Sequence, residues 1–78
     1  MIKQAGILKV IHAVSEIPND PSPDESLFDS GTLDSFTLPD LVTGLEKEFN
    51  VKIPDSDLVP ERFDTVTKIE AYLDSRQT

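Results

Sequence analysis

The sequence contains no cysteine and one histidine, His12, among its 78 residues. Without cysteine the chain can form no disulfide bond and offers no thiolate to a metal ion. A single histidine cannot build a multi-histidine zinc site. Domains of fewer than about 80 residues often depend on disulfide bonds or a bound metal ion for their stability. We therefore expect the packing of helices alone to hold the core together.

Long apolar runs are also missing from the sequence. No stretch approaches the roughly 20 apolar residues that a membrane-spanning helix needs. The first residues, Met1-Ile2-Lys3-Gln4, lead into an amphipathic pattern and lack the charge and cleavage features of a signal peptide. We expect no membrane insertion and a cytoplasmic location.

Positive charge is scarce and unevenly placed. The formal net charge is −8, and no lysine or arginine occurs between Lys9 and Lys47. The same stretch holds eight carboxylates: Glu16, Asp20, Asp24, Glu25, Asp29, Asp34, Asp40 and Glu46. Such a field repels nucleic-acid phosphates and attracts basic protein surfaces, although an acidic surface kept for solubility would look the same. We expect no nucleic-acid partner on either interpretation.

Apolar residues recur at the spacing of amphipathic helices in two segments. The first set predicts a helix over residues 2–15 and consists of Ile7, Val10, Ile11 and Val14. The second predicts a helix over residues 36–50 and consists of Leu38, Leu41, Val42, Leu45 and Phe49. A further helix over residues 65–75 would bury Val66, Ile69 and Leu73, and a short helical turn is expected over residues 55–61.

A long loop is predicted between the first two helices, because Pro18, Pro21 and Pro23 interrupt regular structure there. Leu27 and Phe28 are the residues expected to pin this loop onto the core. No segment shows the period-two alternation of a half-buried strand. The predicted fold is therefore all-α, a small bundle of three longer helices plus a short helical turn, in a single domain over residues 1–78.

The start of the second helix is the most informative part of the chain. Pro39 must lie in its first turn, so the helix begins between Asp34 and Thr37, and Asp34, Ser35 and Thr37 are the candidate N-caps. A helical Phe36 falls about 160° from the centre of the buried stripe. The residues expected on this outer face with it are Asp40, Thr43, Gly44 and Lys47.

An exposed Phe36 rimmed by carboxylates would be a plausible docking point for a partner protein. If the helix begins later, Phe36 turns into the core instead. Ser35 beside it is either a capping residue or a site of modification. It is not expected to be a catalytic nucleophile, because His12 is the only histidine and the glycines of a nucleophile elbow are absent.

Two stretches of this region resemble the acyl carrier protein family. They are Gly31-Thr32-Leu33-Asp34-Ser35-Phe36 and Leu41-Val42-Thr43-Gly44-Leu45-Glu46-Lys47-Glu48-Phe49. The family's hallmark is an Asp-Ser-Leu-like triplet that opens a helix ending in Leu-Glu-x-Glu-Phe. The likeness extends over nearly the whole chain. Asp-Ser-Phe preceded by Gly-x-Leu is also similar to D-alanyl carrier proteins.

The resemblance implies a 4′-phosphopantetheine arm joined to Ser35 by a phosphodiester. A separate phosphopantetheinyl transferase would install the arm from coenzyme A with magnesium, which Asp34 would help to hold. A chain without cysteine would obtain from this arm the thiol that thioester cargo requires. The chain would then be a monomeric, non-catalytic carrier that shuttles acyl or aminoacyl groups between enzymes of fatty-acid, polyketide or related biosynthesis.

The resemblance also implies that the second helix is a docking surface for basic-surfaced enzymes that load and transfer the cargo. The residues expected to take part are Phe36, Asp40, Glu46 and Glu48. Phe36 stands where the common fatty-acid carriers have leucine, and Pro39, Gly44 and Lys47 also depart from their pattern, so the cargo stays open. An unmodified acidic adaptor with the same fold, which only binds a protein partner, is the alternative function.

Overall fold

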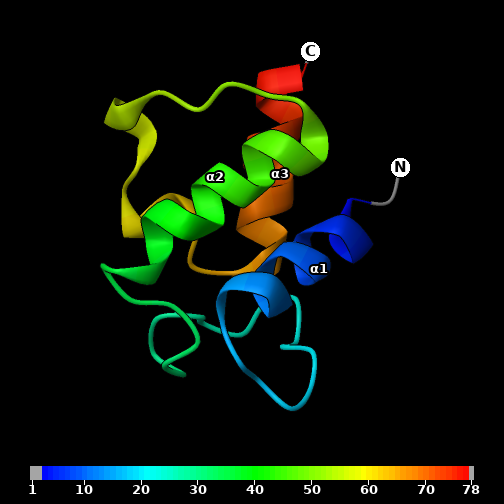
Figure 1. Ribbon diagram of the computed structural model, residues 1–78, viewed down its shortest axis with the longest axis vertical. Helices are drawn as coiled ribbons and strands as arrows, with labels where there is room; N and C mark the ends of the chain where they lie inside the picture. The colour runs from blue at the N-terminus through cyan, green and yellow to red at the C-terminus, as the bar shows by residue number, and fades with distance from the viewer. Residues whose placement is uncertain (1–2, 78) are drawn as a thin grey trace.

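The computed structural model describes residues 3–77, and these fold into three α-helices and two 3₁₀ turns. The helices are α1 (Gln4–Val14), α2 (Thr37–Phe49) and α3 (Val66–Gln77), and the turns are η1 (Asp55–Asp57) and η2 (Pro60–Arg62). No residue of this described range is in a β-strand. The predicted all-α fold is confirmed. Figure 1 shows α2 crossing in front of α3, with the long α1–α2 loop at one end of the molecule.

The helix ends lie close to the expected positions. Lys3 is the N-cap of α1, so the helix begins later than residue 2, which itself lies outside the described residues. Asn50 ends α2 as its C-cap, with φ 55° and ψ 50° in the left-handed region. Asparagine tolerates this conformation better than most residues, and its N–H donates back to the Glu46 carbonyl.

Two details of the C-terminal third differ from the prediction. Residues 55–61 form two separate 3₁₀ turns, and Pro60 begins the second one, where its missing N–H is not needed. The α3 helix continues to Gln77, two residues beyond the predicted end. Its last turn is held because the Ser75 hydroxyl donates to the Tyr72 carbonyl (2.7 Å) and Arg76 Nη2 donates to the Lys52 carbonyl (3.1 Å).

Branched aliphatic side chains from all three helices and from the long loop form the core. Those that are fully buried include Ile7, Ile11, Leu27, Leu33, Leu41, Leu45, Ile69 and Leu73, together with the ring of Phe63. The loop is pinned as predicted, with Leu27 in the core and Phe28 packed against it. Asp64, just before α3, fastens the loop further, because its carbonyl accepts from Leu27 N (2.6 Å) and its Oδ1 accepts from the Ser26 hydroxyl (2.7 Å).

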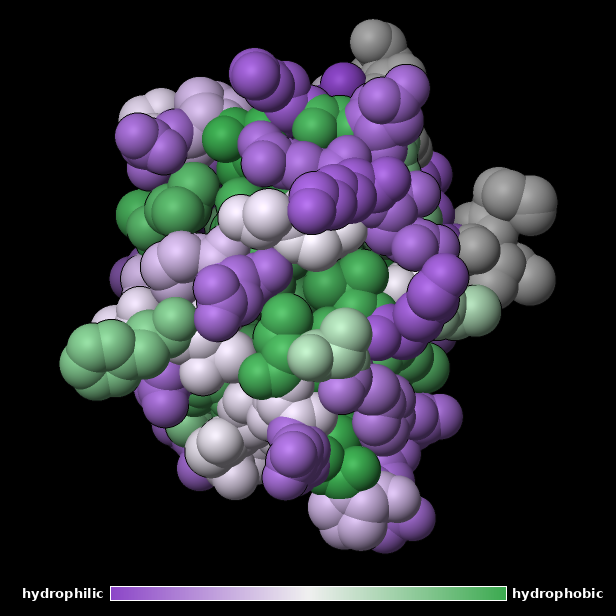
Figure 2. Space-filling view, viewed as in Figure 1, coloured by the Kyte–Doolittle hydropathy of each residue, from purple (hydrophilic) through white to green (hydrophobic). Residues whose placement is uncertain are grey.

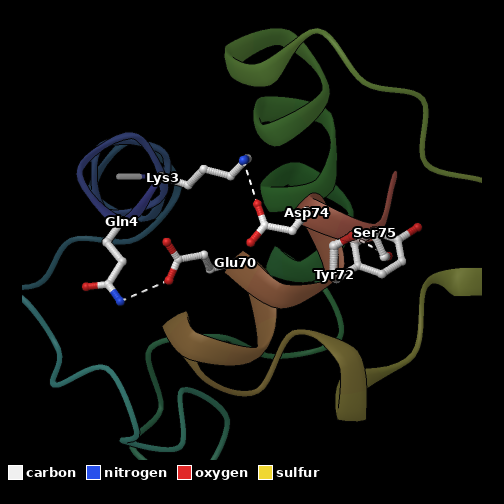
Figure 3. Close-up of polar contacts among 6 residues, drawn as sticks. All are labelled: Lys3, Gln4, Glu70, Tyr72, Asp74 and Ser75. Atoms are coloured by element: carbon white, nitrogen blue, oxygen red, sulfur yellow. Dashed lines mark hydrogen bonds and ion pairs between the residues drawn. The ribbon is translucent and has the colours of Figure 1, made fainter. Parts of the chain in front are cut away.

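Polar contacts join the start of α1 to α3 at the surface (Figure 3). Lys3 Nζ lies 2.6 Å from Asp74 Oδ1, and Gln4 Nε2 donates to Glu70 Oε1 at 3.1 Å. Surface ion pairs of this kind typically stabilise a fold by at most about 1 kcal/mol. They orient the first turn of α1 on α3, whereas the buried side chains supply most of the stability.

Two glycines allow α1 and α2 to pack in close contact. A Cβ atom at Gly6 would lie 2.8 Å from Phe49 Cζ, and one at Gly44 would lie 2.6 Å from Val10 Cγ1. Gly44 therefore faces α1. The prediction that Gly44 lies on the outer face of α2 is wrong, because Gly44 lies on the side of α2 that α1 approaches most closely.

Candidate functional site

Ser35 lies at the junction between the long loop and α2. Its side chain is exposed, and within residues 3–77 its hydroxyl has no hydrogen-bond or ionic partner. The segment that leads to it is fixed. Gly31 makes a turn at φ 84°, and Leu33, buried in the core, donates from its backbone nitrogen to the Leu27 carbonyl at 3.0 Å. The fold thus presents a free hydroxyl from an anchored segment, as covalent attachment of a group would require.

Of the three candidate N-caps, Asp34, Ser35 and Thr37, it is Asp34 whose side chain caps α2. Its Oδ1 accepts hydrogen bonds from Phe36 N (2.9 Å), Thr37 N (2.8 Å) and the Thr37 hydroxyl (2.8 Å). Its carbonyl accepts from Leu38 N at 2.9 Å. The regular helix begins at Thr37, yet helical hydrogen bonding reaches back to Asp34, so Ser35 sits inside the capped turn.

The same contacts set the charge of Asp34. The hydrogen bonds from the Thr37 backbone and hydroxyl, and then from Phe36 N, lower the pKa of this carboxyl below its ordinary value. The carboxylate is therefore ionised at neutral pH. Its second oxygen, Oδ2, accepts none of these bonds and is available to a cation. Sequence reasoning did not assign Thr37 its role as a double donor, although a threonine three residues after a capping aspartate is a usable signal.

Phe36 is 87% exposed, so the expected outer-face position is confirmed and the core alternative is excluded. Asp40, Thr43 and Lys47 are also exposed and follow Phe36 at the spacing i+4, i+7 and i+11. We call these four residues the outer ridge of α2. Figure 2 shows the face of the molecule that includes α2, where hydrophobic side chains occur in small groups among hydrophilic ones.

The other two predicted docking residues do not lie on the outer ridge. Glu46 and Glu48 are two positions apart and so point about 200° away from each other around the helix. Glu46 Oε2 accepts a hydrogen bond from Ile53 N at 2.8 Å, and Glu48 Oε1 lies 3.4 Å from Lys9 Nζ. The structure therefore brings Phe36 and Asp40 together on one surface and places Glu46 and Glu48 on opposite flanks of the helix.

Residues 3–77 contain neither a cluster of metal ligands nor a membrane-spanning helix. In this range no group of three or more histidine, aspartate or glutamate side chains is arranged to hold a metal ion. No helix of the described chain has the length and apolar character needed to cross a membrane.

Comparison with known proteins identifies the family. The family model described as "Phosphopantetheine attachment site" matches residues 5–73. Similar proteins include the D-alanyl carrier proteins of Streptococcus pyogenes serotype M5 (strain Manfredo) and serotype M1. Each is 48% identical to this chain over 46 residues, which are 59% of this chain and 58% of the relative. The alignment thus spans little more than half the length of these curated relatives.

The family match covers most of the chain, from α1 to the middle of α3, and includes the capped turn at Ser35. A phosphopantetheine attachment-site domain is itself non-catalytic and is modified by phosphopantetheinyl transferases. The chain belongs to the phosphopantetheine attachment-site family, a match that implies a covalent 4′-phosphopantetheine group.

Proposed function

We propose that Ser35 is the attachment residue and that the arm carries acyl or aminoacyl groups as thioesters between partner enzymes. The observation that carries this proposal is the Ser35 hydroxyl, exposed and without a partner in the described chain, inside the turn that Asp34 caps. The family match supports this carrier over an unmodified adaptor. The chain supplies no thiol of its own, so the arm must hold the cargo.

In the transfer step, Ser35 Oγ forms a bond to the phosphorus on the pantetheine side of the coenzyme A diphosphate. The P–O–P bridge breaks, the hydroxyl proton is lost, and adenosine 3′,5′-bisphosphate leaves. His12, the only histidine of the sequence, contacts Asp20 through Nε2 (2.7 Å to Oδ1), and no hydrogen bond joins it to Ser35 in the described residues. We expect the transferase to supply the base. This chain's own contribution is an accessible hydroxyl held in a fixed turn.

Asp34 is the residue that we expect to help hold magnesium during that step. The new phosphodiester would stand beside the Asp34 carboxylate, and two neighbouring anions repel each other unless a cation lies between them. The lowered pKa keeps the carboxylate charged, and Oδ2 is not used by the cap. Magnesium prefers such carboxylate and phosphate oxygens. Asp34 therefore has one oxygen for the fold and one for the cation.

We expect the outer ridge to be the docking surface for basic-surfaced partner enzymes. Phe36 supplies exposed aromatic area next to the attachment residue, and Asp40 supplies the nearest carboxylate on the same ridge. Glu46 and Glu48 contribute to the acidic field from the flanks. Charge attraction of this kind raises association rates more than affinity, which suits a carrier that must leave each enzyme after transfer.

The relatives' names favour an aminoacyl group as the first cargo to test, because the similar proteins include D-alanyl carrier proteins. Fatty-acid and polyketide intermediates are the competing cargoes. We expect the carrier to act as a monomer in the cytoplasm, a reducing compartment that a chain without cysteine fits.

The test is the intact mass of the protein after incubation with coenzyme A, magnesium and a broad-specificity phosphopantetheinyl transferase. The wild type should gain one phosphopantetheinyl group, and Ser35→Ala should gain none. Ser56→Ala is the matched control, because Ser56 is also exposed but lies in η1. It should load like the wild type. Folded wild type that gains no mass would overturn the proposal.

A further inference from the structure

The outer ridge of α2 carries opposite charges toward its two ends. Asp40 lies in the first turn of the helix and Lys47 in the last, and both residues are exposed. The seven positions between them correspond to about 10 Å along the helix axis. Within residues 3–77 neither side chain takes part in an ion pair or a hydrogen bond. The ridge therefore offers a negative and a positive group, both unpaired, to whatever binds it.

Lys47 is unpaired although carboxylates stand on both sides of it in the sequence. Glu46 Oε2 accepts a hydrogen bond from the backbone of the connector, and Glu48 Oε1 lies 3.4 Å from Lys9 Nζ. The positions three and four residues to either side of Lys47, which are its neighbours on a helix surface, hold no carboxylate. The acidic groups nearest in the chain are thus engaged elsewhere, and the charge of Lys47 is left for a partner.

A lysine on this ridge opposes the charge of the rest of the surface. The chain has a formal net charge of −8 and no lysine or arginine between Lys9 and Lys47. A partner surface that is basic throughout would be attracted at Asp40 and repelled at Lys47. Like charges that face each other across an interface disfavour the complex, and proteins use such repulsion to reject wrong partners. A partner that carries a carboxylate at this point would gain an ion pair instead.

Lys47 is near enough to Ser35 to be reached by an enzyme that binds there. The twelve positions between them span at most about 18 Å at the rise of a helix. A standard protein interface covers about 800 Å² of each partner, a patch about 32 Å across. An interface centred on Ser35 that follows the ridge therefore includes Asp40 and has Lys47 at its rim. Charges at a rim change the rate of association and the choice of partner.

We infer that Lys47 is a specificity-determining residue of the docking surface. The partner that fits the outer ridge has a basic group opposite Asp40 and a carboxylate opposite Lys47. That partner is the phosphopantetheinyl transferase of the same organism, because this enzyme must cover Ser35 in order to load it. The inference rests on the proposed attachment at Ser35, and it adds that recognition of the ridge needs charges of both signs.

The direction of a rate change tests the inference, with that transferase and low ionic strength. A uniformly basic partner would load Lys47→Glu faster than the wild type, because the carrier becomes more acidic. A paired lysine predicts the opposite. The kcat/KM should fall about fivefold for Lys47→Gln and further for Lys47→Glu, and Lys47→Arg, which keeps the charge, should load like the wild type. Loading of Lys47→Glu at or above the wild-type rate would overturn the inference.

Lys68→Glu is the matched control for net charge. Lys68 is also exposed, but it lies on α3 beside a hollow that no residue of α2 lines. Its kcat/KM should not fall, and an equal fall would show that Lys47 acts only through the total charge. Urea unfolding of each variant shows that the protein is folded in the assay, since a positive charge in the last turn also favours the helix itself.

Binding of the same transferase to Ser35→Ala separates this inference from the proposed function. The measurement compares Ser35→Ala with Ser35→Ala/Lys47→Glu, and the second protein should bind more weakly. Wild type that gains no phosphopantetheinyl group would refute attachment at Ser35, whereas the effect of Lys47 on binding is measured in either case. Equal binding of the two proteins would overturn the role of Lys47.

Discussion

Thr37 donates two hydrogen bonds to one carboxylate oxygen of Asp34, from its backbone nitrogen and from its hydroxyl, both at 2.8 Å. Together with the bond from Phe36 N, they close a turn whose middle residue is Ser35. The aspartate that we expect to hold magnesium is therefore also the cap that shapes the attachment turn. Substitutions can separate these two roles.

Asp34→Asn and Asp34→Ala should have different effects. Asparagine is as good an N-cap as aspartate, so Asp34→Asn should unfold at nearly the same urea concentration as the wild type. Asp34→Ala should unfold at a lower urea concentration. Both should load slowly, because neither supplies an anionic oxygen for magnesium. Transfer rates measured beside urea unfolding test this. Asp34→Asn loading at the wild-type rate would limit Asp34 to capping.

The pH dependence of stability gives an independent reading of the same cap. The folded pKa of Asp34 is lowered, so its stabilising contribution is present above the unfolded value of about 3.9 and is lost as the pH falls through the folded pKa. Wild-type stability should therefore decline below about pH 4 more steeply than that of Asp34→Asn. Parallel curves for the two proteins would show that these bonds do not favour the charged form.

Phe36→Ala should leave the fold intact and lower the efficiency with which partner enzymes act on the carrier. The side chain is 87% exposed, so the free energy of unfolding should change by no more than about 0.5 kcal/mol. Loss of an exposed aromatic from a docking surface should lower kcat/KM of the transferase roughly tenfold. Phe63→Ala is the contrasting control, because that ring is fully buried and its removal should cost about 3–5 kcal/mol. A wild-type kcat/KM for Phe36→Ala would show that Phe36 is not part of the docking surface.

Asp40→Asn should slow transfer to the carrier at low ionic strength. A rim charge is worth up to about 1 kcal/mol, or about fivefold in kcat/KM, and salt should erase the difference. Glu48→Gln is the matched control, because its carboxylate pairs with Lys9 on the flank of α2, and it should have a smaller effect. A larger effect at Glu48 would shift the docking surface toward α1.

Gly44→Ala should destabilise the protein although alanine is the better helix former. The gain in helix propensity is about 1 kcal/mol, but overpacking against Val10 costs about 1–3 kcal/mol, and the β-branched valine cannot easily turn away. In a Val10→Ala background the same substitution should become neutral or stabilising. Urea unfolding of the four proteins measures this coupling. Equal effects of Gly44→Ala in both backgrounds would refute the close contact.

The sequence predicted the helices well because each buried stripe repeats at helical spacing. It left Phe36 either on the outer face or in the core. The structure places it on the outer face, because Phe36 has helical φ and ψ as the N-cap of α2. The sequence pattern misplaced Gly44, because a residue without a side chain carries no signal of which face it occupies. That position depends on where α1 crosses α2, a tertiary property that a helical wheel does not contain.

The candidate site was predictable in part. Asp34 and Ser35 could be named from turn chemistry and from the family resemblance, and Thr37 could have been recognised as the partner of Asp34. The separation of Glu46 and Glu48 from the outer ridge follows from their spacing on the helix, but the hydrogen bond that holds the Glu46 carboxylate could not be anticipated. It depends on Ile53 N finding a carboxylate seven residues earlier in the chain, and that contact exists only once the connector folds back.

The central claim is that the arm is joined to Ser35, and tandem mass spectrometry of loaded wild-type protein tests it most directly. Fragment ions on either side of residue 35 locate the added mass without any substitution that could disturb the turn. We predict that the whole phosphopantetheinyl mass lies on Ser35. Its placement on any other residue, or a folded protein that takes up no group at all, would contradict the account.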